Sequence, residues 1–116
     1  MCNQQCQIIT IQDFITAIRK NLHTRFEISP GFIIKTGKHK FQLLIQDPRC
    51  QICRTSITEV KLRKHKRNPL CVVEFWGNGQ FFDIDHIVRQ ADGGKNNPEN
   101  LQILCRSCHI IKDSPL

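Results

Sequence analysis

Apolar residues near the start of the chain recur at helical spacing. Between Thr10 and Asn21 they are three or four residues apart, which predicts an amphipathic helix packed on a core. Thr10 followed by Asp13 resembles a capping box in which Asp replaces the usual Glu. The apolar positions of this stripe are Ile11, Phe14, Ile15, Ile18 and Leu22.

The next apolar positions form short runs instead. The runs 32–34 and 41–45 flank a polar stretch containing Gly37, which predicts a β-hairpin. Asp47-Pro48 then breaks the pattern. We expect a domain boundary there, with an N-terminal helix-plus-hairpin extension of unknown role at 1–47 and a second domain at 48–116.

The C-terminal half alternates apolar runs with turn residues. Gly77-Asn78-Gly79 separates two apolar runs and predicts a tight turn between antiparallel strands. The expected order is strand 70–76, strand 81–87, polar loop 88–100, strand 101–104 and a helix from 106 to about 112. Mixed helices and strands of this kind predict an α+β fold.

Size and cysteine content change this picture. A chain of 116 residues cannot bury a large apolar core, so a disulfide or a structural metal is expected to help hold it. The seven cysteines are an odd number, which argues against a complete disulfide framework. The first ten residues lack a basic start and a long apolar run, and no stretch reaches transmembrane length. We expect an intracellular protein, cytoplasmic, organellar or nucleoid-associated, rather than a secreted one.

The charge balance is basic. Seventeen Lys and Arg residues against ten Asp and Glu residues give a formal net charge of +7, which favours a polyanionic partner. Five of the basic residues fall between Lys61 and Arg67. By itself that run is as well explained by a solvated loop as by phosphate contacts.

Two Cys-x-x-Cys pairs have the spacing of a zinc site. Cys50 with Cys53, and Cys105 with Cys108, each form a knuckle whose two sulfurs can reach one tetrahedral ion. The interval between the pairs is longer than in an ordinary zinc ribbon, so spacing alone is only moderately specific. Buried free cysteines are the alternative explanation. Cys71 has no partner at this spacing and is expected in the core.

The second knuckle closes a longer pattern. Asp85-His86-Ile87, Gly93-Gly94, Asn100-Leu101 and Cys105 to His109 follow one another in order. This pattern resembles the HNH endonuclease family, in particular members with a ββα-metal core of the His-Me finger type braced by four zinc cysteines. The resemblance covers about residues 50 to 113 and implies a small ββα-metal domain stapled by a four-cysteine zinc site.

The resemblance also implies roles for single residues. Asp85 and His109 are expected to ligate one catalytic divalent ion, Mg²⁺, Mn²⁺ or a similar ion. His86 is expected to be the general base, and Asn100 to brace the loop that presents it. An imidazole with a pKa near 6.5 suits a base at neutral pH, and a hard carboxylate suits Mg²⁺. Taken singly, each of these residues is as easily structural.

The strand geometry puts a condition on this site. Neighbouring residues on a regular strand point to opposite faces, so Asp85 and His86 can serve one site only if the backbone bends between them. We therefore predict irregular backbone at His86. Asp83, on the same strand face as Asp85, either supports a metal ligand through a hydrogen bond or simply faces solvent. Nearby basic residues are candidates for phosphate contacts or plain surface charges, namely Arg89, Lys95, Arg106 and Lys112.

The expected function is a metal-dependent DNA endonuclease that hydrolyses or nicks phosphodiester bonds, with structural Zn²⁺ and double-stranded DNA as the expected partner. Two alternatives stay open: a catalytically inactive, zinc-stabilised DNA-binding module, and an RNA-cleaving HNH enzyme, because contacts to a nucleic-acid backbone do not identify the bases. Target sequence, oligomeric state and biological setting do not follow from these residues.

Overall fold

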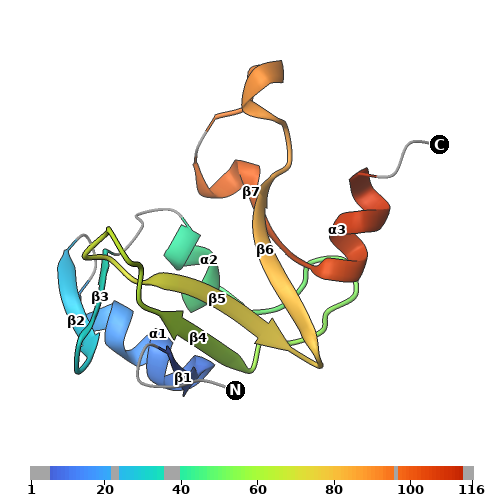
Figure 1. Ribbon diagram of the computed structural model, residues 1–116. Helices are drawn as coiled ribbons and strands as arrows, with labels where there is room; N and C mark the ends of the chain where they lie inside the picture. The colour runs from blue at the N-terminus through green and yellow to red at the C-terminus, as the bar shows by residue number, and fades with distance from the viewer. Residues whose placement is uncertain (1–5, 22–23, 36–39, 96, 114–116) are drawn as a thin grey trace.

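Figure 1 shows the computed structural model, which describes residues 6–21, 24–35, 40–95 and 97–113. Strands and helices alternate along the chain, with two short 3₁₀ turns, η1 and η2, in the loop before the last strand. In chain order the elements are β1 (Cys6–Thr10), α1 (Ile11–Lys20), β2 (Arg25–Ser29), β3 (Phe32–Lys35), α2 (Lys40–Gln46), β4 (Glu59–Arg63), β5 (Val72–Gly77), β6 (Gln80–His86), η1 (Gln90–Asp92), η2 (Pro98–Asn100), β7 (Leu101–Cys105) and α3 (Arg106–Asp113).

Five strands form one antiparallel sheet in the order β1-β4-β5-β6-β7, and β2 and β3 form a separate hairpin. Strands β5 and β6 pair only next to their turn, from Phe75 opposite Phe82 to Gly77 opposite Gln80. Strand β6 then rises away from β5, as Figure 1 shows, and pairs with β7 along the rest of its length. The last two strands and α3 therefore form a ββα unit at one end of the sheet.

The apolar core lies between the sheet and helices α1 and α2. Phe14 of α1 is fully buried, and its ring contacts Phe41 of α2 and Phe75 of β5 edge-on, with centroids 5.5 and 5.6 Å away. The predicted helix is confirmed, because the hydroxyl of Thr10 accepts a hydrogen bond from the Asp13 amide at 3.1 Å as an N-cap. Burial of the apolar stripe thus fixes α1 on the sheet.

The N-terminal residues share this core with the rest of the chain. Strand β1 pairs antiparallel with β4, with Ile8 opposite Lys61. Helix α1 also contacts both strands. The boundary expected at residue 47 stays a prediction, and any separation there would have to break these strand pairs.

The predicted hairpin over 32–34 and 41–45 is wrong. Strand β3 pairs instead with β2, which precedes it, through a turn at Gly31, where φ is +82°. The second run forms helix α2, because burying Phe41 and Leu44 on one side requires residues three apart to share a face. The turn expected around Gly37 lies outside the described residues.

The C-terminal order of elements is confirmed. Strands β5, β6 and β7 and helix α3 lie where the apolar runs predict them, and the described residues of the 88–100 loop contain the short turns η1 and η2 and no other helix or strand. The α+β class is confirmed with them, and the arrangement is consistent with a ββα-metal domain. None of the described helices is both long and apolar enough to cross a membrane.

Candidate metal and catalytic centre

The four cysteines predicted to share a metal do come together. The sulfur atoms of Cys50, Cys53, Cys105 and Cys108 all lie within 4.8 Å of one another, and those of Cys53 and Cys105 are 3.7 Å apart. A tetrahedral zinc ion with Zn–S bonds of about 2.3 Å separates its sulfur ligands by about 3.8 Å. The donor set and its spacing therefore fit zinc.

Backbone hydrogen bonds shape the first knuckle. The Cys50 amide donates to the Thr55 carbonyl, and the Arg54 amide donates back to the Cys50 carbonyl, each at 2.9 Å. Arg54 takes a left-handed conformation with φ of 68°, which lets this short turn close. The Gln51 amide donates to the carbonyl of Ile103 in β7 at 2.9 Å, so the first knuckle is attached directly to the strand that leads into the second.

Crowding gives the thiols unequal acidities. Burial and the neighbouring sulfurs raise the pKa of Cys108 to about 12. Burial acts in the same direction on Cys50, but backbone amides, that of Cys105 first, outweigh it and lower the pKa of Cys50 to about 6. Four thiolates this close repel one another, and a bound cation removes that repulsion.

A second cluster of polar side chains lies between β6 and α3. Asp83 and Asp85 alternate on one face of β6, and His109 and Lys112 lie three residues apart on the facing side of α3. The Nδ1 atom of His109 is 2.7 Å from Oδ2 of Asp83, and its Nε2 atom is 3.8 Å from Oδ2 of Asp85. The two residues predicted to ligate a divalent ion, Asp85 and His109, are thus brought together.

Asp83 fixes the orientation of the imidazole. A carboxylate that accepts a hydrogen bond from Nδ1–H leaves the lone pair of the other ring nitrogen free for a metal. In this structure that nitrogen, Nε2 of His109, is the one directed toward Asp85. Of the two roles considered for Asp83 on the sequence, its contact supports the one that holds a metal ligand in place.

Lys112 contacts the same cluster. Its ammonium group donates to Oδ2 of Asp85 at 2.5 Å and to the backbone carbonyl of His86 at 3.0 Å. Burial raises the pKa of Asp85, but Lys112 outweighs it, and the pKa lies below its usual value. The ionised form of the Asp85 carboxyl group is therefore favoured, which is the form that could bind a metal.

Asn100 makes hydrogen bonds to backbone groups of the loop that follows β6. Its side-chain oxygen accepts from the Val88 amide at 2.8 Å, and its Nδ2 group donates to the carbonyls of Val88 and Lys95 at 2.9 and 2.7 Å. The Asn100 carbonyl also accepts from the Ile87 amide at 2.8 Å. One side chain thereby joins both ends of the loop that follows β6.

The Gly93-Gly94 pair is required by the same loop. Gly93 has φ of +90°, a left-handed conformation that favours glycine. A Cβ atom on Gly94 would lie 1.8 Å from the Val88 carbonyl oxygen, so only glycine fits against that backbone. The backbone geometry of the loop therefore explains why glycine occupies both positions.

The predicted irregular backbone at His86 is wrong. Strand β6 stays regular through His86, which pairs with Leu101, and the bend begins at Ile87. Strand alternation therefore directs the His86 side chain away from the face of Asp85. Its Nε2 atom is buried and has no hydrogen-bond partner among the described residues. The strand persists because β7 continues to pair with it.

A hollow of about 440 Å³ opens beside the Asp–His cluster. Both charged and apolar residues line this hollow. Two of the charged residues, Arg89 and Asp92, form an ion pair with a distance of 2.9 Å. The residues that line it are Asp85, Ile87, Val88, Arg89, Asp92 and Lys112. Solvent or a substrate group can thus approach Asp85 from this side.

Sequence reasoning did not find the contact of Lys112 with Asp85. The signal was present, because residues three apart on a helix share a face and residues two apart on a strand do the same. Once α3 is known to lie against β6, these two spacings place His109 opposite Asp83 and Lys112 opposite Asp85.

Comparison with known proteins matches one part of the chain. The family model described as HNH endonuclease matches residues 69–114, which contain the Asp–His cluster, Asn100 and the second cysteine knuckle. Cys50 and Cys53 lie before the matched segment. No curated protein and no solved structure matches the chain significantly.

Proposed function

We propose that this protein is a metal-dependent DNA endonuclease, because residues 69–114 match the model of the HNH endonuclease family, whose members are generally hydrolytic nucleases. The observation that carries the proposal is the Asp83–His109–Asp85 arrangement. It presents a carboxylate and an oriented imidazole nitrogen 3.8 Å apart beside an open hollow.

Asp85 and His109 would hold the catalytic divalent ion. An oxygen and a nitrogen ligand with further positions open suit Mg²⁺, Mn²⁺ or a similar ion. A bound ion there would supply Lewis-acid stabilisation of the negative charge on the reacting phosphate and the leaving oxygen. Asp83 holds the His109 ring in the tautomer that this role needs.

His86 is the proposed general base. Its ring would take a proton from a water molecule as the water oxygen bonds to phosphorus and the bond from phosphorus to the 3′ oxygen breaks. The products would be a 5′-phosphate and a 3′-hydroxyl. Because His86 ends strand β6, a rotation of the backbone at that end is needed to bring its ring to the Asp85 face.

Zinc in the four-cysteine cluster would have a structural role. Cys105 ends β7 and Cys108 lies in the first turn of α3, so an ion held there fixes the start of the helix that carries His109. Its binding energy would add to folding.

The charge of the chain supports nucleic acid as the substrate. The formal net charge is +7, and the basic run from Lys61 to Arg67 begins within strand β4, on the same sheet as Asp85. Phosphate contacts by Lys and Arg give affinity without reading sequence. DNA is the member of this class that we propose.

Two observations favour the inactive DNA-binding alternative. Lys112 contacts the carboxylate of Asp85, and the Nε2 atom of His86 is buried. In a protein without catalysis both arrangements would persist with nucleic acid bound. In an active enzyme, both would have to change when metal and substrate bind.

A plasmid-nicking assay separates these functions. The zinc-loaded protein is incubated with supercoiled plasmid in Mg²⁺ or Mn²⁺, beside His109→Ala and His86→Ala. We expect divalent-dependent conversion to nicked or linear DNA, and a loss of about a hundredfold or more in each variant. A structured RNA of similar length, assayed in parallel, tests the RNA-cleaving alternative.

Glu99→Gln is the matched control, because Glu99 is an exposed acidic residue in η2 outside the cluster. It should nick at the wild-type rate. The absence of divalent-dependent nicking, or equal nicking by wild type and His109→Ala, would remove the enzyme proposal and leave the binding module.

A further inference from the structure

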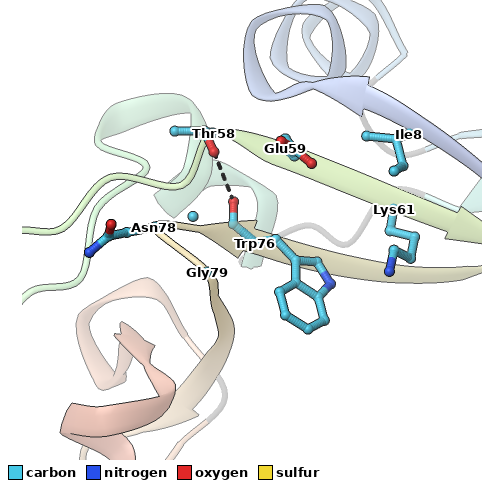
Figure 2. Close-up of a pocket in the computed structure, with 8 residues that line it drawn as sticks. Ile8, Thr58, Glu59, Lys61, Trp76, Asn78 and Gly79 are labelled. Atoms are coloured by element: carbon cyan, nitrogen blue, oxygen red, sulfur yellow. Dashed lines mark hydrogen bonds between the residues drawn. The ribbon is translucent and has the colours of Figure 1, made fainter. Parts of the chain in front are cut away.

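The five-stranded sheet has a second face that the core does not use. Val60 and Leu62 of β4 are fully buried, so Lys61 between them points to the opposite face. Strand register places Ile8 beside Lys61, and Ile8 is 50% exposed. Figure 2 shows Lys61 and Trp76 on the side of the strands away from helix α1. We call this surface, formed by Ile8, Glu59, Lys61, Arg63, Glu74 and Trp76, the open sheet face.

Trp76 forms a fixed aromatic platform on the open sheet face. Its ring meets the ring of Phe81 edge-on, with centroids 5.8 Å apart at 71°. The ammonium nitrogen of Lys61 lies 5.0 Å from the centroid of the Trp76 ring. A hollow of about 210 Å³ opens beside the indole, between Ile8, Glu59 and the turn at Asn78 (Figure 2). The indole is thus partly exposed at a surface opening, in contact with Phe81 and Lys61.

The charges around the platform have an order. Arg63 forms an ion pair with Glu74 on the same face, so those two charges offset each other. Glu59 lines the hollow next to the indole, which makes that spot unfavourable for a phosphate. Lys61 lies over the ring itself, where its ammonium group has no carboxylate partner within ion-pair distance among the described residues. This order favours a neutral base against Trp76 and a phosphate at Lys61.

The open sheet face continues into the proposed catalytic cluster. Trp76 pairs with Phe81 across the β5–β6 turn, and Phe81, Asp83 and Asp85 then alternate along one face of β6. Four residues of extended strand separate Phe81 from Asp85 by about 13 Å. A nucleic-acid strand lying on Trp76 can therefore continue to the Asp–His cluster.

We propose that the open sheet face binds unpaired DNA nucleotides next to the phosphate that is cut. Trp76 stacks on one exposed base, and Lys61 contacts an adjoining phosphate. An unpaired base is required because the bases of an intact duplex are stacked on one another and present no free ring face. This inference rests on the proposed nuclease function and adds the form of DNA that the enzyme engages.

The chain supplies its own probe for this binding. Trp76 is the only tryptophan, and the sequence contains no tyrosine, so the tryptophan emission reports on this residue alone. The full-length, zinc-loaded protein is titrated with oligothymidylate of about twelve nucleotides at low salt and without Mg²⁺ or Mn²⁺. We expect quenching of Trp76 emission that saturates. The same oligonucleotide annealed to oligoadenylate should quench less and bind more weakly.

Variants test the two contacts separately by anisotropy of a labelled oligothymidylate. Trp76→Ala should weaken binding between about fivefold and a hundredfold, the range for one stacked base, and Trp76→Phe should retain part of the affinity. Lys61→Ala should lower the slope of log affinity against log salt by about one phosphate contact. Lys20→Ala, which removes an exposed charge on α1, is the matched control and should leave the slope nearly unchanged.

The outcomes separate this inference from the proposed function. Oligonucleotide binding without quenching, wild-type affinity in Trp76→Ala and Trp76→Phe, or equal quenching by the duplex would each overturn the binding of unpaired bases at Trp76. Divalent-dependent plasmid nicking by the same wild-type preparation would still support the nuclease. Loss of affinity in folded Trp76→Phe and Lys61→Ala proteins, with Lys20→Ala unchanged, would support the inference.

Discussion

Helix α3 serves two clusters of opposite character through adjacent residues. Cys108 faces the sulfur cluster, in which three of the four cysteines are buried, and His109 faces Asp83 and Asp85 beside an open hollow. Consecutive helical residues point about 100° apart, which keeps the two sites separate. The enclosed cluster suits a permanent structural ion, and the open one suits a metal that must meet a substrate.

The two clusters also differ in what holds their side chains. Backbone hydrogen bonds and burial hold the sulfur atoms in place. Asp85 is held by the ammonium group of Lys112 on α3, which a metal ion could displace. Substitutions in the sulfur cluster should therefore reduce the stability of the fold, and substitutions in the Asp–His cluster should reduce catalytic activity. The following predictions test that division.

The largest effect is expected from Cys105→Ser. Cys105 is 1% exposed, and loss of its thiolate would weaken the binding of the metal ion. In small zinc domains this binding contributes on the order of 10 kcal/mol to folding. This is comparable to the whole stability of a small domain, so the variant should be largely unfolded at 25 °C. Circular dichroism and zinc content by mass spectrometry measure the result.

Cys71→Ser is the control for that change. Cys71 is partly buried against the core and lies outside the sulfur cluster, so the variant should keep its zinc and its fold. A folded, cooperative Cys105→Ser protein would contradict the structural role of the cluster.

The next effect concerns Asp83→Asn. Loss of the carboxylate that orients His109 should lower divalent-ion affinity and plasmid nicking each by about 10- to 100-fold. The melting temperature should change little, because the side chain lies outside the apolar core. Mn²⁺ binding followed by electron paramagnetic resonance gives a readout independent of activity.

The opposite pattern in Asp83→Asn, a large drop in melting temperature with normal Mn²⁺ affinity, would show that this carboxylate is structural. Glu99→Gln again provides the matched change of charge at an exposed site.

A smaller effect is expected for Asn100→Ala. The substitution removes three side-chain hydrogen bonds to backbone groups of the loop after β6. We expect a loss of about 1–3 kcal/mol in unfolding free energy and faster hydrogen exchange at the Val88 amide. Exchange in β4 should stay slow. Unchanged exchange at Val88 would mean that Asn100 does not brace the loop.

The smallest effect is expected in the alkylation rates of two cysteines, Cys71 and Cys53, in the native, zinc-loaded protein. Burial raises the pKa of the Cys71 thiol above its ordinary value of 9.0, so its reactive thiolate forms only as pH rises past that value. Cys53 is exposed but is expected to be protected by the metal. Iodoacetamide should modify neither residue quickly at pH 7.

Raising the pH above 9.0 should progressively increase the modification of Cys71 by iodoacetamide and leave Cys53 protected. Peptide mass spectrometry distinguishes the two sites. Rapid modification of Cys53 at either pH would indicate that the sulfur cluster holds no metal, because a free exposed thiol has no other protection there.

Local sequence patterns were sufficient wherever a segment's own spacing decided its structure. The capped helix α1, the β5–β6 turn, strand β7 and helix α3 were all predicted, because turn residues and apolar periodicity act over a few positions. The run 41–45 was wrongly predicted as a strand. A short apolar run fits both element types, and packing against Phe14 made it helical.

The sequence alone determined which residues were candidates for metal chemistry: two cysteine knuckles, and an acid and a histidine in family order. Tertiary structure decided how they meet. Only the docking of α3 on β6 places Asp83 against His109 and Lys112 against Asp85, and only the persistence of strand pairing keeps His86 on the opposite face. The two side-chain contacts join residues 26 and 27 positions apart, and no local spacing rule reaches that far.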